Sequence, residues 1–339
     1  MADLFENPLG TDGFEFVEFT SPDPDAVAKL FETMGFVAVS RHPTKDVVRY
    51  VQNDITYLLN REKSGHAAEF RDAHGPSACG MAFRVKDAAF AFKGALERGA
   101  TDRTGAGVFG ADVPVIEGIG GSLLYLIDAY GDAGSAYADW TPIEGAQARL
   151  ATAETGQLYL DHLTHNVRRG NMATWADFYE RVFNFREIRY FDIQGKATGL
   201  FSKAMTSPDG KIRIPLNESK GEEGKIDQIE EFILEYKGEG IQHIALACRN
   251  LYDTVDELTR RGLPLQDTID TYYDLVDSRL PGHGEPVEEL RRRRMLIDGD
   301  PANGGGLLLQ IFSKNAIGPI FFEFIQRKGN EGFGEGNFK

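Results

Sequence analysis

The stretch YLDHLTHNVRRGN, residues 159–171, carries two histidines, His162 and His165, three positions apart. On a helix this spacing would bring both side chains to one face, where they could hold one metal ion. On a β-strand it places them on opposite faces. The segment alternates as a strand does, with one face formed by Leu160, His162 and Thr164 and the other by Asp161, Leu163 and His165. We therefore predict a strand whose two histidines point apart, and we expect His165 to be an ordinary hydrogen-bonded histidine.

This predicted strand opens one of four related segments of the chain. Residues 14–36 (FEFVEFTSPDPDAVAKLFETMGF) and 161–185 (DHLTHNVRRGNMATWADFYERVFNF) each have the pattern of a strand, an amphipathic helix and a final Gly-Phe or Asn-Phe pair. Residues 79–100 and 242–263 each begin with a strand and a short turn, and their helices end at Arg-Gly. We therefore predict an α+β fold of two tandem domains, each built from a pair of βαβββ modules.

The boundary between the predicted domains falls in the polar stretch of residues 141–157. We expect residues 1–150 to form the N-terminal domain and residues 151–339 the C-terminal domain, because each part has an ordinary domain size.

The charge of the chain restricts its partners. Its 37 Lys and Arg residues against 52 Asp and Glu residues give a net charge of −15, which argues against nucleic acid and membrane surfaces. The run Arg291–Arg294 follows EPVEEL and predicts a solvated helix end with Glu–Arg pairs.

Cys79 and Cys248 form no CxxC pattern, so we expect no disulfide scaffold. The N-terminus MADLFENPLG lacks the pattern of a secretory signal, and no apolar run could span a bilayer, so we expect a cytoplasmic protein.

Aligning the repeated segments brings three metal-ligating residues to matching positions. In the second half these are His162, His243 and Glu323, each on the predicted inner face of a strand. The first half has no such set, with Glu15, Gly80 and Tyr125 at the aligned positions. Two imidazoles and one carboxylate leave three coordination positions open, the pattern of non-haem Fe(II) oxygenases. Zinc accepts the same ligand types, but structural zinc sites are usually closed and four-coordinate.

Seven segments of the chain resemble one known family. They are DHLTHNV, FYERVFNFREIRYFDI, SKAMTSPDGKIRIPLNE, GEGIQHIAL, DTYYDLVDSRLPGHGEPV, LLLQIF and FFEFIQRKGNEGFGEGNFK, and they are similar to sequences of 4-hydroxyphenylpyruvate dioxygenases. The resemblance implies the vicinal-oxygen-chelate fold of glyoxalase-like half-barrels and an Fe(II) cofactor. It also implies conversion of the 2-oxo acid 4-hydroxyphenylpyruvate and O2 to homogentisate and CO2, a step of tyrosine catabolism.

The same resemblance implies roles for individual residues. His162, His243 and Glu323 match the iron ligands of the family. Its substrate-holding polar residues match Ser202, Asn217, Gln228, Gln242 and Gln310, which can meet a phenol or a carboxylate without adding charge. Its aromatic wall matches Phe312, Phe321, Phe333 and Phe338. The bulk of Phe312 favours homogentisate, because related 4-hydroxymandelate synthases tend to have a smaller aliphatic residue there.

Three alternatives stay open at this point. A 4-hydroxymandelate synthase would use the same iron and substrate but release another product. A non-catalytic binding protein on this fold is a second alternative, and the intact ligand set argues against it. An extradiol ring-cleaving dioxygenase is the third, and it would need an acid–base histidine beside the open coordination positions.

Two expectations concern parts of the chain outside the ligand set. The N-terminal domain is expected to complete the scaffold and to supply the interface of a homo-oligomer, a dimer or a tetramer. In the family a C-terminal helix follows the GFGEGNF motif and covers the site, and this sequence ends at Lys339, where that helix is expected to start. Gly329, Gly332, Gly334 and Gly336 predict a hinge before it.

Overall fold

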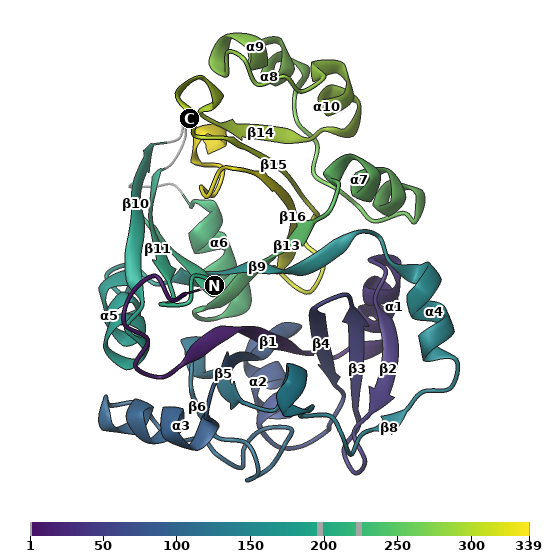
Figure 1. Ribbon diagram of the computed structural model, residues 1–339, viewed down its shortest axis with the longest axis vertical. Coiled ribbons are helices and arrows are strands. Elements are labelled where there is room, and N and C mark those ends of the chain that lie inside the picture. Colours follow the sequence, from purple (N-terminus) through teal and green to yellow (C-terminus); the bar gives the residue numbers. More distant parts are fainter. Residues whose placement is uncertain (1, 195–198, 222–225, 339) are drawn as a thin grey trace.

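Each half of the chain forms one eight-stranded sheet (Figure 1). The computed structural model describes residues 2–194, 199–221 and 226–338. In both sheets two antiparallel strands lie at the centre, β1 with β5 and β9 with β13. Each central strand also pairs in parallel with the last strand of its own module, which is β4, β7, β12 or β16. The two sheets therefore share one plan.

The N-terminal sheet has the strand order β6-β7-β5-β1-β4-β3-β2-β8. Its strands are β1 (Thr11–Thr20), β2 (Val37–Arg41), β3 (Val47–Gln52), β4 (Ile55–Asn60), β5 (Ser77–Val85), β6 (Val115–Glu117), β7 (Leu123–Ile127) and β8 (Thr141–Pro142). Its helices are α1 (Pro24–Thr33), α2 (His66–His74) and α3 (Ala88–Glu97), with the short 3-10 turns η1 (Ile119–Gly121) and η2 (Gly131–Ala133). Helix α4 (Ala146–Ala153) leads to the second sheet.

The C-terminal sheet has the order β10-β11-β12-β9-β13-β16-β15-β14. Its strands are β9 (Gln157–Val167), β10 (Arg186–Gln194), β11 (Gly199–Thr206), β12 (Arg213–Ser219), β13 (Gly240–Cys248), β14 (Leu296–Gly299), β15 (Leu307–Phe312) and β16 (Phe321–Lys328). Its helices are α5 (Met172–Phe183), α6 (Gln228–Tyr236), α7 (Leu251–Arg260), α8 (Asp270–Asp274), α9 (Val276–Arg279) and α10 (Val287–Arg293), with 3-10 turns η3 (Pro301–Asn303) and η4 (Glu335–Phe338).

The predicted α+β fold of βαβββ modules is confirmed, with one local difference. Three of the modules have three strands after their helices. Among the described residues of the second module only β6 and β7 follow α3 on its side of the sheet, because β8 pairs with β2 at the opposite edge. Instead of a further strand, Asp102 forms a single bridge with Ile116. The surrounding segment TDRTGAGVFG, residues 101–110, is rich in glycine and has little apolar alternation, which disfavours a strand.

Several helices begin at an Asp or Asn whose side chain accepts a hydrogen bond from a backbone N–H of the first turn. These N-cap residues are Asp23 of α1, Asp87 of α3, Asp227 of α6 and Asn250 of α7. In α7 the buried residues Leu251, Val255 and Leu258 recur at helical spacing, so one face of the helix packs inward and the other stays in water.

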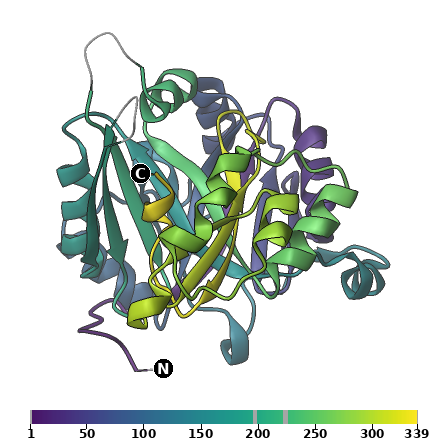
Figure 2. The same ribbon diagram turned by 90° about the horizontal axis from the view of Figure 1, so that it is seen from above.

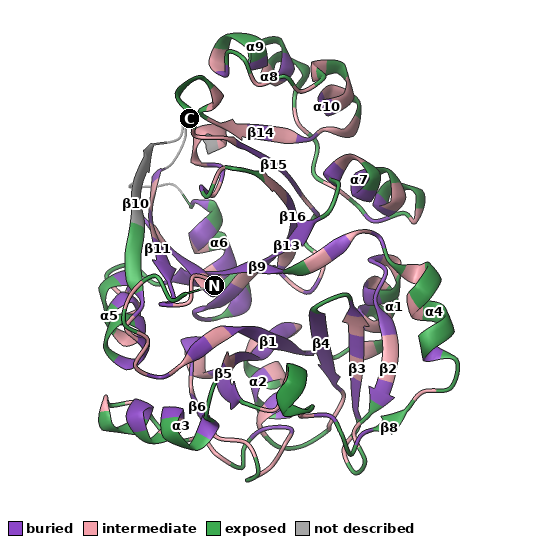
Figure 3. Ribbon diagram, viewed as in Figure 1, coloured by how far each residue is buried: buried purple, intermediate pink, exposed green. Residues whose placement is uncertain are grey.

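The larger of two apolar clusters contains residues of both sheets, and the strands β1 and β9, which face each other across the halves, are largely buried (Figure 3). Phe19 and Tyr57 of the N-terminal sheet lie near Phe322 of the C-terminal sheet, with ring centroids 6.5 and 6.2 Å apart. A second cluster, which includes Phe16 and Tyr125, fills the N-terminal half on the opposite face of β1. The N-terminal half is therefore packed with side chains on both faces of its central strands.

The C-terminal sheet curls round so that its two edge strands approach each other (Figure 1). Turn η4, near the end of the chain, contacts both edges, β10 and β14. Seen from above, the last turn of the chain, in yellow, lies just beside the teal strands of the sheet (Figure 2). The sheet and this last segment together surround the inner faces of β9, β13 and β16.

The arginine run and the two cysteines agree with what the sequence predicts. Arg291, Arg292 and Arg293 form the predicted pairs with Glu288 or Glu289 of α10. Arginines of the run also pair with carboxylates of other helices, for example Arg293 with Asp256 of α7 at 2.6 Å and Arg291 with Asp274 of α8 at 2.8 Å. Both cysteines are buried and unpaired. Among the described residues no helix is long and apolar enough to cross a membrane.

Candidate metal centre

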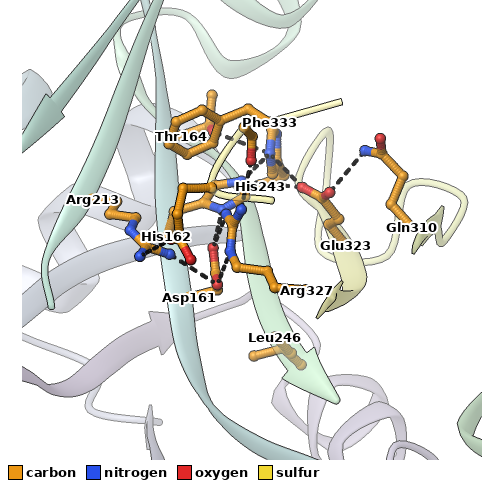
Figure 4. Close-up of polar contacts among 12 residues, drawn as sticks. Asp161, His162, Thr164, Arg213, His243, Leu246, Gln310, Glu323, Arg327 and Phe333 are labelled. Atoms are coloured by element: carbon orange, nitrogen blue, oxygen red, sulfur yellow. Dashed lines mark hydrogen bonds and ion pairs between the residues drawn. The ribbon is translucent and has the colours of Figure 1, made fainter. Parts of the chain in front are cut away.

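The structure brings His162, His243 and Glu323 together from three neighbouring strands (Figure 4). Ala245 of β13 pairs with His162 of β9 on one side and with Glu323 of β16 on the other, so these strands lie edge to edge in fixed register. The two Nε2 atoms are 3.3 Å apart, and Glu323 Oε2 lies 3.1 Å from His162 Nε2 and 3.3 Å from His243 Nε2. All three side chains are largely shielded from water, with exposed fractions of 2%, 12% and 2%.

This triangle of donor atoms has the size that one metal ion requires. Bonds of about 2.1 Å separate neighbouring ligand atoms by about 3.0 Å at octahedral angles and by about 3.4 Å at tetrahedral angles. The observed separations of 3.1 to 3.3 Å lie between these values. In residues 2–194, 199–221 and 226–338 no fourth His, Cys, Asp or Glu joins the set. The described residues therefore form an open three-ligand site rather than a closed zinc site.

Each of the two histidines follows a bulge in its strand. The β9–β13 ladder skips one residue at Asp161 and one at Gln242. A bulge breaks the strand's alternation, so it can turn the extra side chain toward the next residue instead of the opposite face. Asp161 Oδ1 lies 2.8 Å from His162 Nδ1, and Gln242 Oε1 lies 2.5 Å from His243 Nδ1. Both imidazoles thus donate from Nδ1 and present Nε2 to the triangle.

The electrostatics favour a positive charge inside the triangle. Burial alone would raise the pKa of Glu323, but the two histidines outweigh it and lower the pKa to about 2. Burial would lower the pKa of His162, but Glu323 and Asp161 raise it above its ordinary value. Burial dominates at His243 and lowers its pKa. Glu323 stays ionised, and its negative charge favours a positive charge between the two imidazoles. That charge can be a proton on His162 or a divalent cation bound by all three side chains.

The predicted polar residues take up different positions around this triangle. Gln310 on β15 donates from Nε2 to Glu323 Oε1 at 2.9 Å, and it is fully buried. Ser202 and Asn217 face each other in register on β11 and β12. Gln228 is exposed in the first turn of α6. The structure thus places Gln310 and Gln242 against the predicted ligands, and the substrate-holding roles of all five residues stay predictions.

Aromatic rings flank the two imidazoles. Phe321 stacks on His243, with ring centroids 4.9 Å apart and planes 18° apart. Phe312 meets both of these rings edge-on, at 6.3 Å from His243 and 5.8 Å from Phe321. Phe333 meets the ring of His162 edge-on at 5.1 Å. The side chain of Phe338 lies outside the described part of the chain.

His165 points away from the triangle, as the strand alternation predicts. Its Nε2 lies 2.7 Å from the hydroxyl of Tyr179 on α5, and burial lowers its pKa to about 3. An extradiol mechanism would need another histidine beside the open positions. None of the four other histidines, His42, His66, His74 and His283, belongs to the cluster around the triangle.

One aligned position of the N-terminal half was predicted wrongly. β1 pairs with β5 through Phe16 and Ala82, as β9 pairs with β13 through His162 and Ala245. Phe16, not Glu15, therefore stands where His162 stands in the other sheet. Glu15 is the bulge residue before it, and the bulge shifts the alignment by one residue.

Gly80 and Tyr125 stand where the sequence alignment placed them. The space between the strands is filled by hydrogen-bonded side chains, because Tyr125 donates to Glu18 Oε2 at 2.6 Å and Asn60 donates to Glu18 Oε1 at 2.8 Å. Burial raises the pKa of Glu18 despite these two hydrogen bonds. No metal-ligand set occurs among the described residues of this half.

Two residues near the triangle were missed from the sequence. Asp161 supports His162, as described, and the hydroxyl of Thr164 lies 3.0 Å from His243 Nε2. Regular alternation places Asp161 on the far face of its strand, so only knowledge of the bulge would have found it. The strand alternation places Thr164 on the same face as His162, so the sequence could have indicated that Thr164 lies near the ligands.

Comparisons with known proteins show which family the chain is similar to. The family model for the N-terminal part of hydroxyphenylpyruvate dioxygenase matches residues 5–140. The model of the glyoxalase, bleomycin resistance protein and dioxygenase superfamily matches residues 159–276. The chain is 56% identical to 4-hydroxyphenylpyruvate dioxygenase of Pseudomonas aeruginosa over 98% of this chain and 93% of that protein.

Relatives with other names are similar too. The chain is 56% identical to the protein named hemolysin VllY of Vibrio vulnificus, again over 98% of this chain and 93% of the relative. A mutant of 4-hydroxymandelate synthase from Streptomyces coelicolor has a similar structure, with a TM-score of 0.81, 25% identity and coverage of 97% of this chain and 96% of that one. From its sequence, its two sheets and these relatives, the chain belongs to the family of 4-hydroxyphenylpyruvate dioxygenases.

Proposed function

We propose that the protein is an Fe(II)-dependent dioxygenase that converts 4-hydroxyphenylpyruvate and O2 to homogentisate and CO2. The triangle of His162 Nε2, His243 Nε2 and Glu323 Oε2, with sides of 3.1 to 3.3 Å, is the main support. It matches the two-histidine, one-carboxylate set of non-haem iron oxygenases. The 56% identity to a 4-hydroxyphenylpyruvate dioxygenase supports the substrate and product.

The three donors would hold the iron, and bound Fe(II) would supply the redox chemistry for O2 that protein side chains cannot. Asp161 and Gln242 fix which imidazole nitrogen faces the ion. Gln310 fixes the orientation of Glu323 by donating to its other oxygen. These contacts hold the donors in place before any substrate binds, which lowers the cost of forming the reactive geometry.

The surrounding side chains would orient the substrate and limit water. Phe312 and Phe321 lie on the inner face beside His243, where they can flank an aromatic ring. Amides in this region can bind the oxygen atoms of the substrate without bringing a competing charge to the centre. No lysine or free histidine is needed as a strong acid or base, because the carboxylate leaves as CO2 and the keto oxygen stays in the product.

The product of the reaction tests this proposal. Protein loaded with Fe(II) under anaerobic conditions is given 4-hydroxyphenylpyruvate and then O2, and the products are identified by chromatography and mass spectrometry. We expect homogentisate and one CO2 for each O2 consumed. Release of 4-hydroxymandelate would replace the proposal by the synthase alternative, which the similarity to the Streptomyces structure keeps in view. Tight iron binding with neither product would reject both.

The ligand assignment is tested by removing one imidazole. His243→Ala leaves two of the three donors, so we expect iron content after loading to fall from near one per chain to near zero, with loss of activity. His283→Gln is the matched control, because His283 pairs with Asp277 far from the triangle. Full iron content or full activity in His243→Ala would show that the ion lies elsewhere.

A further inference from the structure

The buried carboxylate of Asp161 lies behind His162 and contacts two arginines, Arg327 and Arg213 (Figure 4). The side chain of Asp161 is fully shielded from water. Arg327 of β16 donates to it through two nitrogens, Nε and Nη2, each at 2.8 Å, and Arg213 of β12 adds a longer contact at 3.3 Å. Asp161 is thus held from one side by Arg327 while it holds the imidazole of His162 on the other.

Arg327 also binds the segment that follows its strand. Its third nitrogen, Nη1, donates to the carbonyl oxygens of Asn330 at 3.0 Å and Gly332 at 2.6 Å. Its guanidinium lies 5.6 Å from the ring centre of Phe333, the ring that meets His162 edge-on. A closed circuit of contacts therefore runs from His162 through Asp161 and Arg327 to residues 330–333 and back to His162.

A second chain of contacts joins Glu323 to the same segment. Gln310 donates to Glu323 Oε1 and accepts a hydrogen bond from Asn337 Nδ2, both at 2.9 Å. Gly334 has a φ of +77° and lies so close to Gln310 that a Cβ there would overlap the Gln310 amide. The close approach of residues 334–337 to Gln310 thus depends on a glycine at position 334.

We propose that residues 330–337, here named the C-terminal strap, and the metal centre stabilise each other, with Asp161 as the positioning residue that links them. The strap anchors Arg327, Arg327 fixes Asp161, and Asp161 fixes His162 with Nε2 turned to the ion. Because coupling between two sites is reciprocal, a metal ion that favours this arrangement also holds the strap down, and loosening the strap weakens metal binding by the same factor. The inference rests on the metal centre of the proposed function but not on its substrate.

The first test uses the unaltered chain and no substrate. Amide hydrogen exchange of residues 330–337 is measured by mass spectrometry with and without Fe(II) under anaerobic conditions. We expect exchange in the strap to slow by about tenfold or more when the metal binds, in the range of typical coupling. Unchanged exchange in the strap, with the metal shown to be bound by calorimetry, overturns the inference.

The second test changes the strap and reads the metal. Gly334→Ala places a methyl group against Gln310, and we expect the Kd for Fe(II) to rise by about tenfold, with exchange of the strap accelerated. Gly304→Ala is the matched control, because Gly304 has the same φ of +77° and open space around its Cβ position. Its Kd should stay within about twofold of the unaltered chain. A normal Kd in Gly334→Ala, with the strap shown to be displaced, overturns the inference.

The third test changes the link itself. We expect Asp161→Asn and Arg327→Gln each to weaken Fe(II) binding by about tenfold to a hundredfold. Glu15→Gln is the control, since Glu15 is the equivalent bulge residue of the N-terminal sheet and pairs with Arg84 at 2.6 Å without any ligand set nearby. Equal Kd values in Arg327→Gln and Glu15→Gln count against the link. These measurements need no substrate, so a protein that forms no homogentisate could still show coupling between the strap and the metal. A protein that forms homogentisate but shows no such coupling would contradict the inference and not the proposed function.

Discussion

At the scale of single residues, His162 and His165 show how far a strand pattern reaches. Alternation separated the two histidines correctly, and the comparison of repeats picked out His243 and Glu323, which lie 3.3 Å apart in the structure. Alternation also placed Asp161 on the wrong face, because a bulge inserts a residue that no pattern of polar and apolar letters reveals. The same one-residue shift explains why Glu15 was aligned in place of Phe16.

His165 gives a pH prediction, because its pKa of about 3 in the folded protein lies below its ordinary value near 6.5. At a pH between these two pKa values the imidazole of His165 is protonated in the unfolded chain and neutral in the folded chain. This contribution to stability is therefore complete above about pH 6.5 and is lost progressively as the pH falls toward 3. Replacing His165 by Gln keeps a polar partner for Tyr179 but removes the titration.

The measurement is the free energy of unfolding of the metal-depleted protein, by denaturant titration at several pH values from 4 to 7. We expect the slope against pH to be smaller in His165→Gln by up to about 1.4 kcal/mol per pH unit, which corresponds to one proton. His283→Gln serves as the comparison, since His283 pairs with the exposed carboxylate of Asp277, whereas His165 faces only the hydroxyl of Tyr179. Parallel curves for His165→Gln and the unaltered chain would mean that His165 binds a proton equally well in the folded and the unfolded chain, so that its pKa is not lowered by the fold.

At the scale of elements, the repeat in the sequence predicted one helix after the first strand of each module, and the structure has these helices as α1, α3, α5 and α7. Their starts follow from cap residues such as Asp23 and Asn250, and their buried faces follow from apolar spacing. The glycines after β16 were predicted as a hinge because of their freedom, yet Gly334 is also required for close packing against Gln310. Such a requirement depends on a neighbour brought in by tertiary structure, so the local sequence does not reveal it.

The cap of α7 offers a stability prediction at this scale. Asn250 accepts a hydrogen bond from Tyr252 N at 3.1 Å, and Asn250→Ala would leave that N–H without its partner. We expect the free energy of unfolding to fall by about 0.5–2 kcal/mol, while Asn250→Asp should stay close to the unaltered chain. Denaturant unfolding followed by circular dichroism measures both, and an equal loss in the two variants would point to a contact other than the cap.

At the scale of the whole molecule, the two halves are held together by core residues and by the N-terminal segment. Leu4 N donates to Pro208 O at 2.7 Å, and the Thr11 hydroxyl lies 2.9 Å from Asp209, so the start of the chain is bound to the C-terminal sheet. The repeat in the sequence predicted two similar halves but gave no information on this contact, because it pairs residues about two hundred positions apart.

Phe322 tests whether the halves unfold as one unit. Its ring is fully buried where the two sheets meet, near Phe19 and Tyr57. We expect Phe322→Ala to lower the free energy of unfolding by about 3–5 kcal/mol and to split one thermal transition into two, because the cavity lies in the shared core. Phe322→Leu should lose less and keep a single transition. Calorimetry distinguishes these outcomes, and a small loss in the Ala variant would mean that the sheets contribute little to each other.

The bulges have a consequence for protein design. Glu15 and Cys79 interrupt the N-terminal ladder at the positions where Asp161 and Gln242 interrupt the other, although no ligand depends on them there. The backbone that aims two imidazoles is therefore already present in the half that lacks them. An engineer who wanted a second catalytic pocket in this polypeptide would need only to exchange side chains at Phe16, Gly80 and Tyr125 and clear the hydrogen-bonded filling around Glu18, without rebuilding any strand.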